Sequence, residues 1–163
     1  MYRTHAVRAG NTLGARCRRL LGLCALGFGV AAGAINNPEA PDYIGEFQAR
    51  AAQYEQAVAG AAGGNASAEL GAWVAFLERE LAVAEAALAG SLADEEQHQL
   101  QRAQSHWRAQ FDADEQLMRS LWSPERAGSS AALSVGQARA TALQQRVELL
   151  LRMRATVGSH TDD

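Results

Sequence analysis

Several residue types are scarce in this sequence, and each absence narrows what the chain can be. Its 163 residues include no lysine, so every basic side chain is one of fifteen Arg, and no acid precedes Glu39. Both cysteines, Cys17 and Cys24, lie in this acid-free beginning. Strand patterns are also missing, because β-branched residues are sparse and polar and apolar residues do not alternate. A β-sheet protein is therefore excluded, and disulfides cannot hold the later part of the chain together.

The acid-free beginning has the layout of a secretory signal. Five Arg in the first nineteen residues precede an uncharged run, 20–34, which ends in Ala32-Gly33-Ala34. A basic head, a short apolar run and small residues at its end predict cleavage, here after Ala34. The run has fifteen residues, four of them Gly, whereas a membrane-spanning helix needs roughly 20 apolar residues. We therefore expect a periplasmic or secreted chain without membrane contact after cleavage, rather than a retained anchor.

Two weaker export patterns overlap this segment. Arg18-Arg19 resembles a twin-arginine signal, but the residues around the pair do not fit that pattern. Cys24 would be the anchoring residue of a lipoprotein, but Leu23 directly before it suits such a site poorly. Cleavage after Ala34 remains the expected form.

The chain after Ala34 is acidic. Residues 35–163 carry ten Arg against all eighteen Asp and Glu, which gives a formal charge of −8. This charge repels nucleic acid and anionic lipid and favours a basic protein partner. Because these 129 residues contain no cysteine, they must rely on an apolar core, which a chain of this length can supply.

Apolar residues recur at steps of three and four over four segments, and this spacing predicts helices. We expect them at 41–59, 67–89, 91–122 and 131–157. Short links between such helices predict an all-α fold, an antiparallel bundle of about four helices preceded by a cleaved signal peptide. The expected organisation is a signal peptide at 1–34, an N-terminal helix and linker at 35–66, the main helical domain at 67–157 and a disordered tail at 158–163.

The third expected helix combines a cap, an apolar stripe and one misplaced acid. Ser91 with Asp94 resembles a capping box at its beginning. Its inward stripe is expected to be Leu100, Ala103, Trp107, Phe111, Met118 and Leu121. The regular step between Phe111 and Met118 falls on Asp114, so we expect Asp114 to be a buried acid that pairs with Arg139 or Arg146. In the last helix the inward residues are expected to be Val135, Ala142, Leu143, Val147, Leu150 and Met153.

Catalytic and metal-binding patterns are incomplete. Glu95-x-x-His98 has the spacing of one part of a di-iron carboxylate site, but such a site needs two copies and two further Glu. His106 has neither a second His at ligand spacing nor the partners of a hydrolytic triad. Asp112 and Asp114 lie about 200° apart around a helix and cannot flank one bond. We therefore expect no enzymatic activity, no metal and no cofactor.

The end of the third helix is the best candidate for a binding surface. Trp122 lies beside the loop 123–130, and an aromatic side chain at a loop edge is a typical binding anchor. The alternative, which burial favours, is that Trp122 covers the end of the helical core. The candidate interface comprises Glu115, Trp122, Glu125 and Arg126.

The second half of the chain resembles a known family. Ala103-Gln104-x-x-Trp107 followed by Asp112-Ala113-Asp114 is similar to the Ala-Gln-x-x-Trp and Arg-Asp-Ala-Glu signature of the lysozyme inhibitor LprI-like family. The similarity extends over about residues 67–154. The resemblance implies an exported helical domain that binds and blocks lysozyme, and it marks the motif residues Ala103, Gln104, Trp107, Asp112 and Asp114.

The sequence departs from that family in three places. Phe111 stands where the motif has Arg, Asp114 stands where it has Glu, and the cysteine pairs frequent in the family are missing.

A basic c-type lysozyme suits a chain with a charge of −8, because opposite charges steer association. The alternative function is a non-catalytic helical interaction module of the cell envelope with another protein partner.

Overall fold

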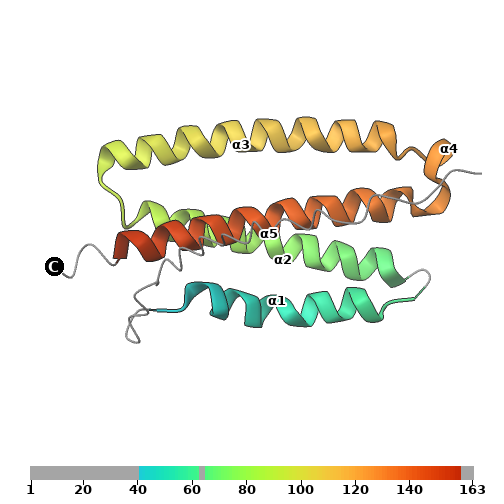
Figure 1. Ribbon diagram of the computed structural model, residues 1–163, viewed down its shortest axis with the longest axis horizontal. Coiled ribbons are helices and arrows are strands. Elements are labelled where there is room, and N and C mark those ends of the chain that lie inside the picture. The colour runs from blue at the N-terminus through green and yellow to red at the C-terminus, as the bar shows by residue number, and fades with distance from the viewer. Residues whose placement is uncertain (1–40, 63–64, 159–163) are drawn as a thin grey trace, which may run out of the picture. The chain divides into compact units, whose positions relative to one another are not determined.

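The computed structural model describes residues 41–62 and 65–158, which all belong to the unit 36–163. The elements are α1 (Tyr43–Gly60), α2 (Asn65–Ala89), α3 (Asp94–Leu121), the short α4 (Pro124–Ala127), the 3-10 turn η1 (Gly128–Ser130) and α5 (Ala131–Gly158) (Figure 1). The prediction of an all-α fold with four long helices is confirmed, and no strand occurs within the described ranges. The signal peptide expected at 1–34 lies outside the described residues, as do residues 159–163 of the tail expected at 158–163, whereas Gly158 ends α5. None of the described helices has the length and apolar character needed to span a bilayer.

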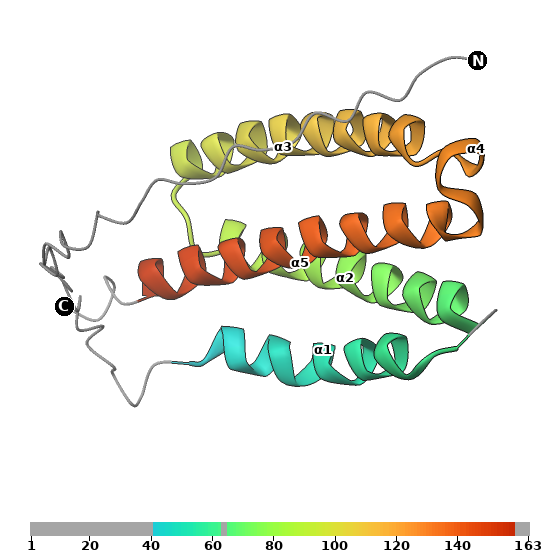
Figure 2. The same cartoon turned by 45° about the vertical axis from the view of Figure 1, so that its right-hand side comes forward.

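Each long helix runs antiparallel to the next one along the chain, so α2 and α5 run parallel to each other, and the four helices form three layers. In both Figure 1 and Figure 2, α2 and α5 lie side by side in the middle, with α1 on one side of this pair and α3 on the other. The α2–α5 pair has by far the most extensive packing, whereas α3 approaches α5 over fewer positions. The bundle is therefore a central pair covered on two sides, rather than a ring of four equivalent neighbours.

The hydrophobic core lies mainly between α2 and α5. The buried apolar residues that α3 and α1 contribute are Leu100, Phe47 and Ala51, and all others in the core cluster come from the central pair. Leu77, Val147 and Leu150 are fully covered there. Gly136 permits a close approach of the two helices, because a Cβ atom at this position would lie 2.7 Å from Cδ2 of Leu70.

Aromatic stacking and one ion pair attach α1 to α2. The ring of Phe76 stacks with Tyr54 at a centroid distance of 4.5 Å and with Phe47 at 6.3 Å. Beside these rings, the guanidinium of Arg50 donates two hydrogen bonds to the Glu80 carboxylate, from Nε at 3.1 Å and from Nη2 at 2.8 Å. The first layer therefore combines apolar burial with one paired charge.

The beginning of α3 differs from the predicted capping box. Ser91 donates its hydroxyl proton to the Leu88 carbonyl oxygen at 2.8 Å, and the N-cap residue of α3 is Ala93. The backbone N–H of Ala93 donates to the Glu96 carboxylate at 3.0 Å. The prediction of a Ser91–Asp94 box is wrong because the helix begins two residues later, which gives the returning carboxylate to Glu96.

The predicted apolar stripe of α3 is covered only in part. Leu100 is buried and Trp107, Phe111 and Met118 are half-buried, whereas Ala103 and Leu121 are exposed. Met153 of α5, also predicted to face inward, is 44% exposed. The physical reason is that α3 lies against one side of the central pair, so only a narrow line of its surface is covered.

Two neighbouring leucines on α5 test where the core lies. Leu150 is fully buried, and Leu149 is 38% exposed. We expect Leu150→Ala to lower the free energy of unfolding by about 2–5 kcal/mol, because it removes buried methyl groups and leaves a cavity. Leu149→Ala is the matched control and should cost clearly less. Urea unfolding followed by far-ultraviolet circular dichroism measures both, and equal losses would contradict the assigned core.

Candidate functional site

A polar network joins the middle of α3 to α2 and α5. Gln104, which is only 2% exposed, donates from Nε2 to a Glu85 carboxylate oxygen at 3.0 Å. Its amide oxygen accepts a hydrogen bond from Nε of Arg146 at 2.7 Å. The same Glu85 oxygen accepts from Nη2 of Arg108 at 2.7 Å. The network satisfies the buried amide and fixes the register of α3 against the central pair.

Two aromatic rings on α3 face the arginines of α5. Trp107 and Phe111 stack with their centroids 5.1 Å apart. The guanidinium of Arg146 lies over the Trp107 ring at 5.3 Å, and that of Arg139 lies over the Phe111 ring at 5.2 Å. Cation–π contacts of this kind add attraction to the apolar contact between the layers.

A second charged cluster lies further along α3. Glu115, 8% exposed, accepts hydrogen bonds from Arg139 of α5 and from Arg119 one turn later on α3. Arg139 also donates from Nη2 to Glu78 of α2 at 2.7 Å. These four residues connect α2, α3 and α5, and their two positive charges balance their two negative ones.

The Glu115 cluster changes the pKa of its members. Burial by itself would raise the pKa of Glu115, but the hydrogen bond from Arg119 and the charges of Arg139 and Arg119 outweigh it, so the pKa lies below its ordinary value. For Arg139 burial by itself would lower the pKa, and the contacts with Glu78 and Glu115 raise it instead. Each group therefore favours its charged form in the folded chain.

The acid predicted to be buried is the wrong one. Asp114 is exposed, and its neighbour Glu115 makes the contact with Arg139 that was expected of Asp114. Glu115 therefore does not belong to an accessible interface, in which the sequence had placed it. Residues 114 and 115 fit the helical spacing equally well, but only one of them points at α5. The longer Glu side chain also reaches the guanidinium across the gap between the layers.

The motif residues divide between the two sides of α3. Gln104 is buried and Trp107 is half-buried, while Ala103, Asp112 and Asp114 are exposed. The first two serve the contact with α2 and α5. Two residues of the motif therefore help to hold α3 in place, and the other three are accessible to a partner.

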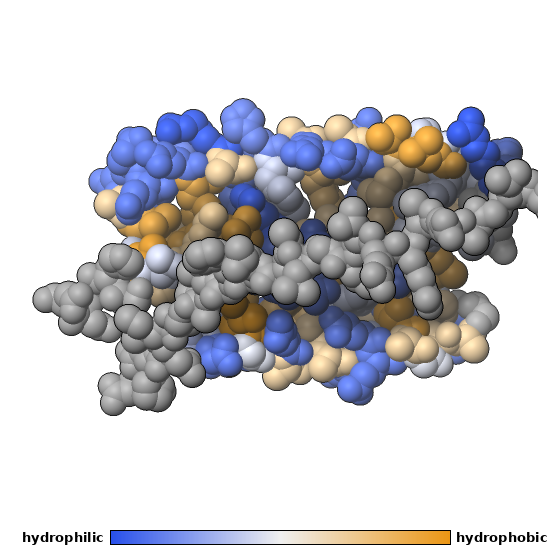
Figure 3. Space-filling view, viewed as in Figure 1, coloured by the Kyte–Doolittle hydropathy of each residue, from blue (hydrophilic) through white to orange (hydrophobic). Residues whose placement is uncertain are grey.

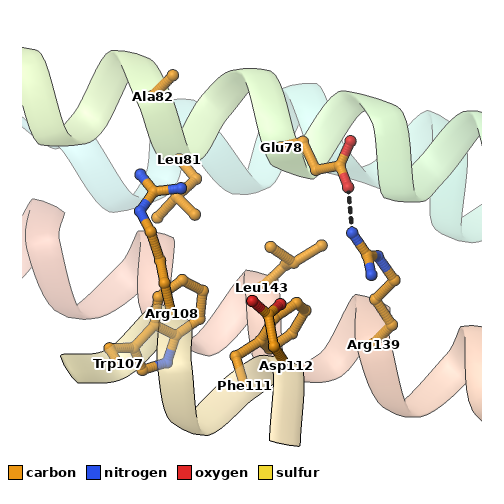
Figure 4. A pocket seen from close by; sticks show the side chains of 9 residues that line it. All are labelled: Glu78, Leu81, Ala82, Trp107, Arg108, Phe111, Asp112, Arg139 and Leu143. Carbon is orange, nitrogen blue, oxygen red and sulfur yellow. Dashed lines mark hydrogen bonds and ion pairs between the residues drawn. The ribbon is translucent and has the colours of Figure 1, made fainter. Parts of the chain in front are cut away.

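A cavity of about 300 Å³ lies between α2, α3 and α5. Its lining residues, drawn in Figure 4, are Glu78, Leu81, Ala82, Trp107, Arg108, Phe111, Asp112, Arg139 and Leu143. At one end the Glu78 carboxylate already accepts a hydrogen bond from Arg139 (Figure 4). A carboxylate held by an arginine is a poor general base, so this arrangement suits packing and binding better than acid–base chemistry.

The C-terminal end of α3 exposes large apolar side chains. Leu117 is 56% exposed, Leu121 is 50% exposed and Trp122, which caps the helix, is 40% exposed. Figure 3 shows hydrophobic side chains gathered on the outer edge of the molecule over this end of α3, among hydrophilic ones. Of these residues the sequence had pointed to Trp122; it missed Leu117, although Leu117 and Leu121 are one turn apart and share a face.

The short helix α4 follows this exposed end. Glu125 and Arg126 of α4 are both exposed, as a candidate interface requires. A hydrogen bond from the Ser123 side chain, assisted by the backbone N–H of Glu125, lowers the pKa of Glu125. Gly128 then turns the chain toward α5 with a φ of 60°, a conformation that favours glycine.

An apolar hollow of about 500 Å³ lies beside the exposed end of α3. Leu117 and Met118 line it from α3, Ala142 lines it from α5, and the exposed carboxylate of Asp114 stands among them. An apolar hollow with one acid can hold the aliphatic stem of a Lys or Arg side chain and pair with its charged head.

Within 41–62 and 65–158 no three His, Cys, Asp or Glu side chains form a group that could hold a metal ion. Glu95 and His98, the residues of the incomplete di-iron pattern, are both exposed on the first turns of α3. The Glu95 carboxylate accepts a hydrogen bond from Gln99 at 3.3 Å.

Comparisons with protein-family models, with curated proteins and with solved structures found no match. The resemblance to the LprI-like family therefore stays a prediction from the sequence motif.

Adjacent acids on α3 provide a matched test of the charged cluster. Glu115→Gln removes the carboxylate that two arginines share, so we expect the free energy of unfolding to fall by about 1.5–3 kcal/mol. Asp114→Asn changes an exposed acid and should stay within about 0.5 kcal/mol. Urea unfolding at pH 7 measures both losses, and a larger loss for Asp114→Asn would contradict the cluster.

The lowered pKa of Glu115 also predicts a pH dependence. Because the folded chain favours the charged form of Glu115, this carboxylate stabilises the fold. Its stabilisation is fully present above the pKa of Glu115 in the unfolded chain, which is near the ordinary 4.5. This stabilisation is lost as the pH falls through the lower pKa of the folded state. The difference in unfolding free energy between the unaltered chain and Glu115→Gln should therefore be constant from pH 7 to 6 and shrink below pH 4.5. A difference that grows on acidification would show the opposite sign of the shift.

Proposed function

We propose that this chain is a non-enzymatic, exported helical module that binds a basic protein through the end of α3. The α3-end surface comprises Asp114, Leu117, Leu121, Trp122 and Glu125. A c-type lysozyme is the partner to test first, and inhibition would follow from covering its cleft.

The observation behind the proposal is the exposure of three large apolar side chains at the end of α3, whose other exposed residues are polar or alanine. Leu117, Leu121 and Trp122 are each at least 40% exposed. Contiguous apolar side chains on a soluble surface mark binding sites, because their burial by a partner releases water. Tryptophan in particular is enriched among the residues that dominate binding free energy.

The charges beside these apolar residues favour a basic partner. Asp114 and Glu125 are exposed at the two ends of the surface, and the chain after Ala34 has a formal charge of −8. The hollow beside Asp114 suits the stem and head of a partner's Lys or Arg. Opposite charge raises the association rate and orients the encounter.

The α3-end surface is held from behind by the Glu115 cluster. Glu115 follows Asp114 directly and is tied to Arg139 of α5. A surface fixed before binding loses less conformational entropy when the complex forms. The LprI-like resemblance adds support from an independent direction, because the exposed motif residue Asp114 belongs to this surface.

Substitutions in the α3-end surface test the proposal. We expect Trp122→Ala to weaken binding to lysozyme about tenfold or more, as removal of a central anchor does. Asp114→Asn should mainly slow association and reduce its dependence on salt. Val83→Ala is the control, because Val83 is 62% exposed on α2, outside this surface. Surface plasmon resonance at low and moderate salt measures the rates.

Lysis of bacterial cell walls separates the two parts of the proposal. Slower lysis by lysozyme in the presence of the chain, restored by Trp122→Ala, supports inhibition through this surface. Full lysis at excess chain and low salt would remove lysozyme as the target. Equal weakening by Val83→Ala would contradict the surface itself.

A further inference from the structure

A second hollow lies at the other end of α3, away from the α3-end surface. It is a groove of about 470 Å³, where the beginning of α3 crosses the end of α2 and the last turns of α5. Its walls are strongly apolar and are formed by Leu88, Leu92, Leu100, Ala103, Met153 and Val157. Figure 3 shows hydrophobic side chains beneath the first turns of α3. The volume is that of a small-molecule site, and such sites combine apolar walls with a few polar groups.

Arg146 is the positive charge among the residues that line the groove, and no carboxylate of the described residues forms an ion pair with it. Its Nε donates to Gln104, an uncharged amide, and its guanidinium face covers Trp107. Among the residues that the structure describes, no carboxylate lies within 4.0 Å of Arg146. The acid whose charge influences Arg146, Glu85, is already paired with Arg108.

Arg139 and Arg146 lie on the same helix and both cover an aromatic ring, but they differ in their carboxylate partners. Arg139 pairs with Glu115 and Glu78, so its charge is balanced at close range. Arg108 makes the close contact with Glu85, so among the described residues Arg146 has no carboxylate at ion-pair distance. Burial lowers the pKa of Arg146; the charge of Glu85 opposes this effect, and the repulsion by Arg108 adds to it. An arginine nevertheless keeps its charge, so it favours an anion from outside the chain.

The groove has a direction. Because α3 and α5 run antiparallel, Arg146 lies beside Gln104, while Val157 lies near the beginning of α3. Eleven residues of helix separate Arg146 from Val157, a distance of about 16 Å. Glu96, the acid in the groove, lies about 12 Å along α3 from Gln104 and accepts a hydrogen bond from the Ala93 backbone. An elongated ligand can therefore meet Arg146 with one end and apolar walls with the rest.

We propose that this groove binds an unbranched fatty acid, with the carboxylate at Arg146 and the alkyl chain along Leu100, Met153 and Val157. A carboxylate accepts hydrogen bonds from the free edge of a guanidinium, and such charge-assisted bonds are the strong ones. The alkyl chain gains by covering apolar walls that are open to water. The site is independent of the proposed protein partner, because it lies at the opposite end of α3.

Dodecanoate, used below its critical micelle concentration, is the probe that tests the site. Isothermal titration calorimetry on the purified chain should show one binding site. The fluorescence of Trp107 should change as well, because Arg146 covers its ring. Trp73→Phe/Trp122→Phe leaves Trp107 as the single reporter. Dodecanol and dodecyltrimethylammonium have the same alkyl chain without the negative charge, and we expect each to bind at least about tenfold more weakly.

Two variants distinguish the charge from the groove. Arg146→Gln should weaken dodecanoate binding about tenfold or more and leave dodecanol binding unchanged. Ala103→Phe places a ring in the groove and should weaken both ligands. Arg152→Gln is the matched control on the same helix, because Arg152 is exposed and already paired with Glu148; it should bind dodecanoate like the unaltered chain. Far-ultraviolet circular dichroism confirms that each variant is folded.

The outcomes are decisive in both directions. Loss of dodecanoate binding in Arg146→Gln and Ala103→Phe, with binding kept in Arg152→Gln, supports the site. Absence of dodecanoate binding to the unaltered chain would overturn the proposal. Equal affinity for dodecanol, unchanged affinity in Arg146→Gln, or binding confined to an apolar peptide with a free C-terminal carboxylate would overturn it as well.

Discussion

The close pairing of α2 with α5 is the constraint on which the rest of the structure depends. Leu77, Val147 and Leu150 are completely covered between these helices, and Gly136 lets α5 approach Leu70 of α2. Because this pair covers most of the apolar surface, it supplies most of the hydrophobic free energy. The outer helices attach to an assembled pair instead of completing a ring. Each of them can therefore use a different kind of contact, aromatic stacking for α1 and paired charges for α3.

The polar attachment of α3 explains the surfaces that surround it. Gln104 and Glu115 are the two buried polar residues in the described part of the chain, and both lie on α3. Hydrophobic burial is non-directional, whereas a satisfied polar network fixes one register. Long arginine side chains span the distance between α3 and the central pair, so the layers meet without a continuous apolar seam. Hollows therefore remain along α3. The apolar side chains at its C-terminal end stay exposed, because the polar contacts hold the helix without burying them.

The helices follow from local information, while the buried acid does not. Periodicity and glycine or proline stops lie within each segment, so the four long helices were predictable. The path from Phe111 to Met118 can pass through Asp114 or Glu115, because steps of three and four both keep to one face. The position of Arg139 on another helix decides between them, and a single segment contains no such information. The exposure of the apolar residues at the end of α3 could not be predicted either. Periodicity shows which residues share a helix face, but it does not show whether another helix covers that face.

The absence of lysine has a structural counterpart in the way α3 is held. Arg139 stacks its planar face over Phe111 while its edges donate to Glu115 and Glu78. Arg146 makes the same use of face and edge at a second ring. A guanidinium can do both at once because its donors lie in the plane that stacks, whereas a lysine ammonium is a compact point charge. A helix with one buried leucine can be held in place by flat cations, and this architecture therefore depends on arginine in particular and not on positive charge in general.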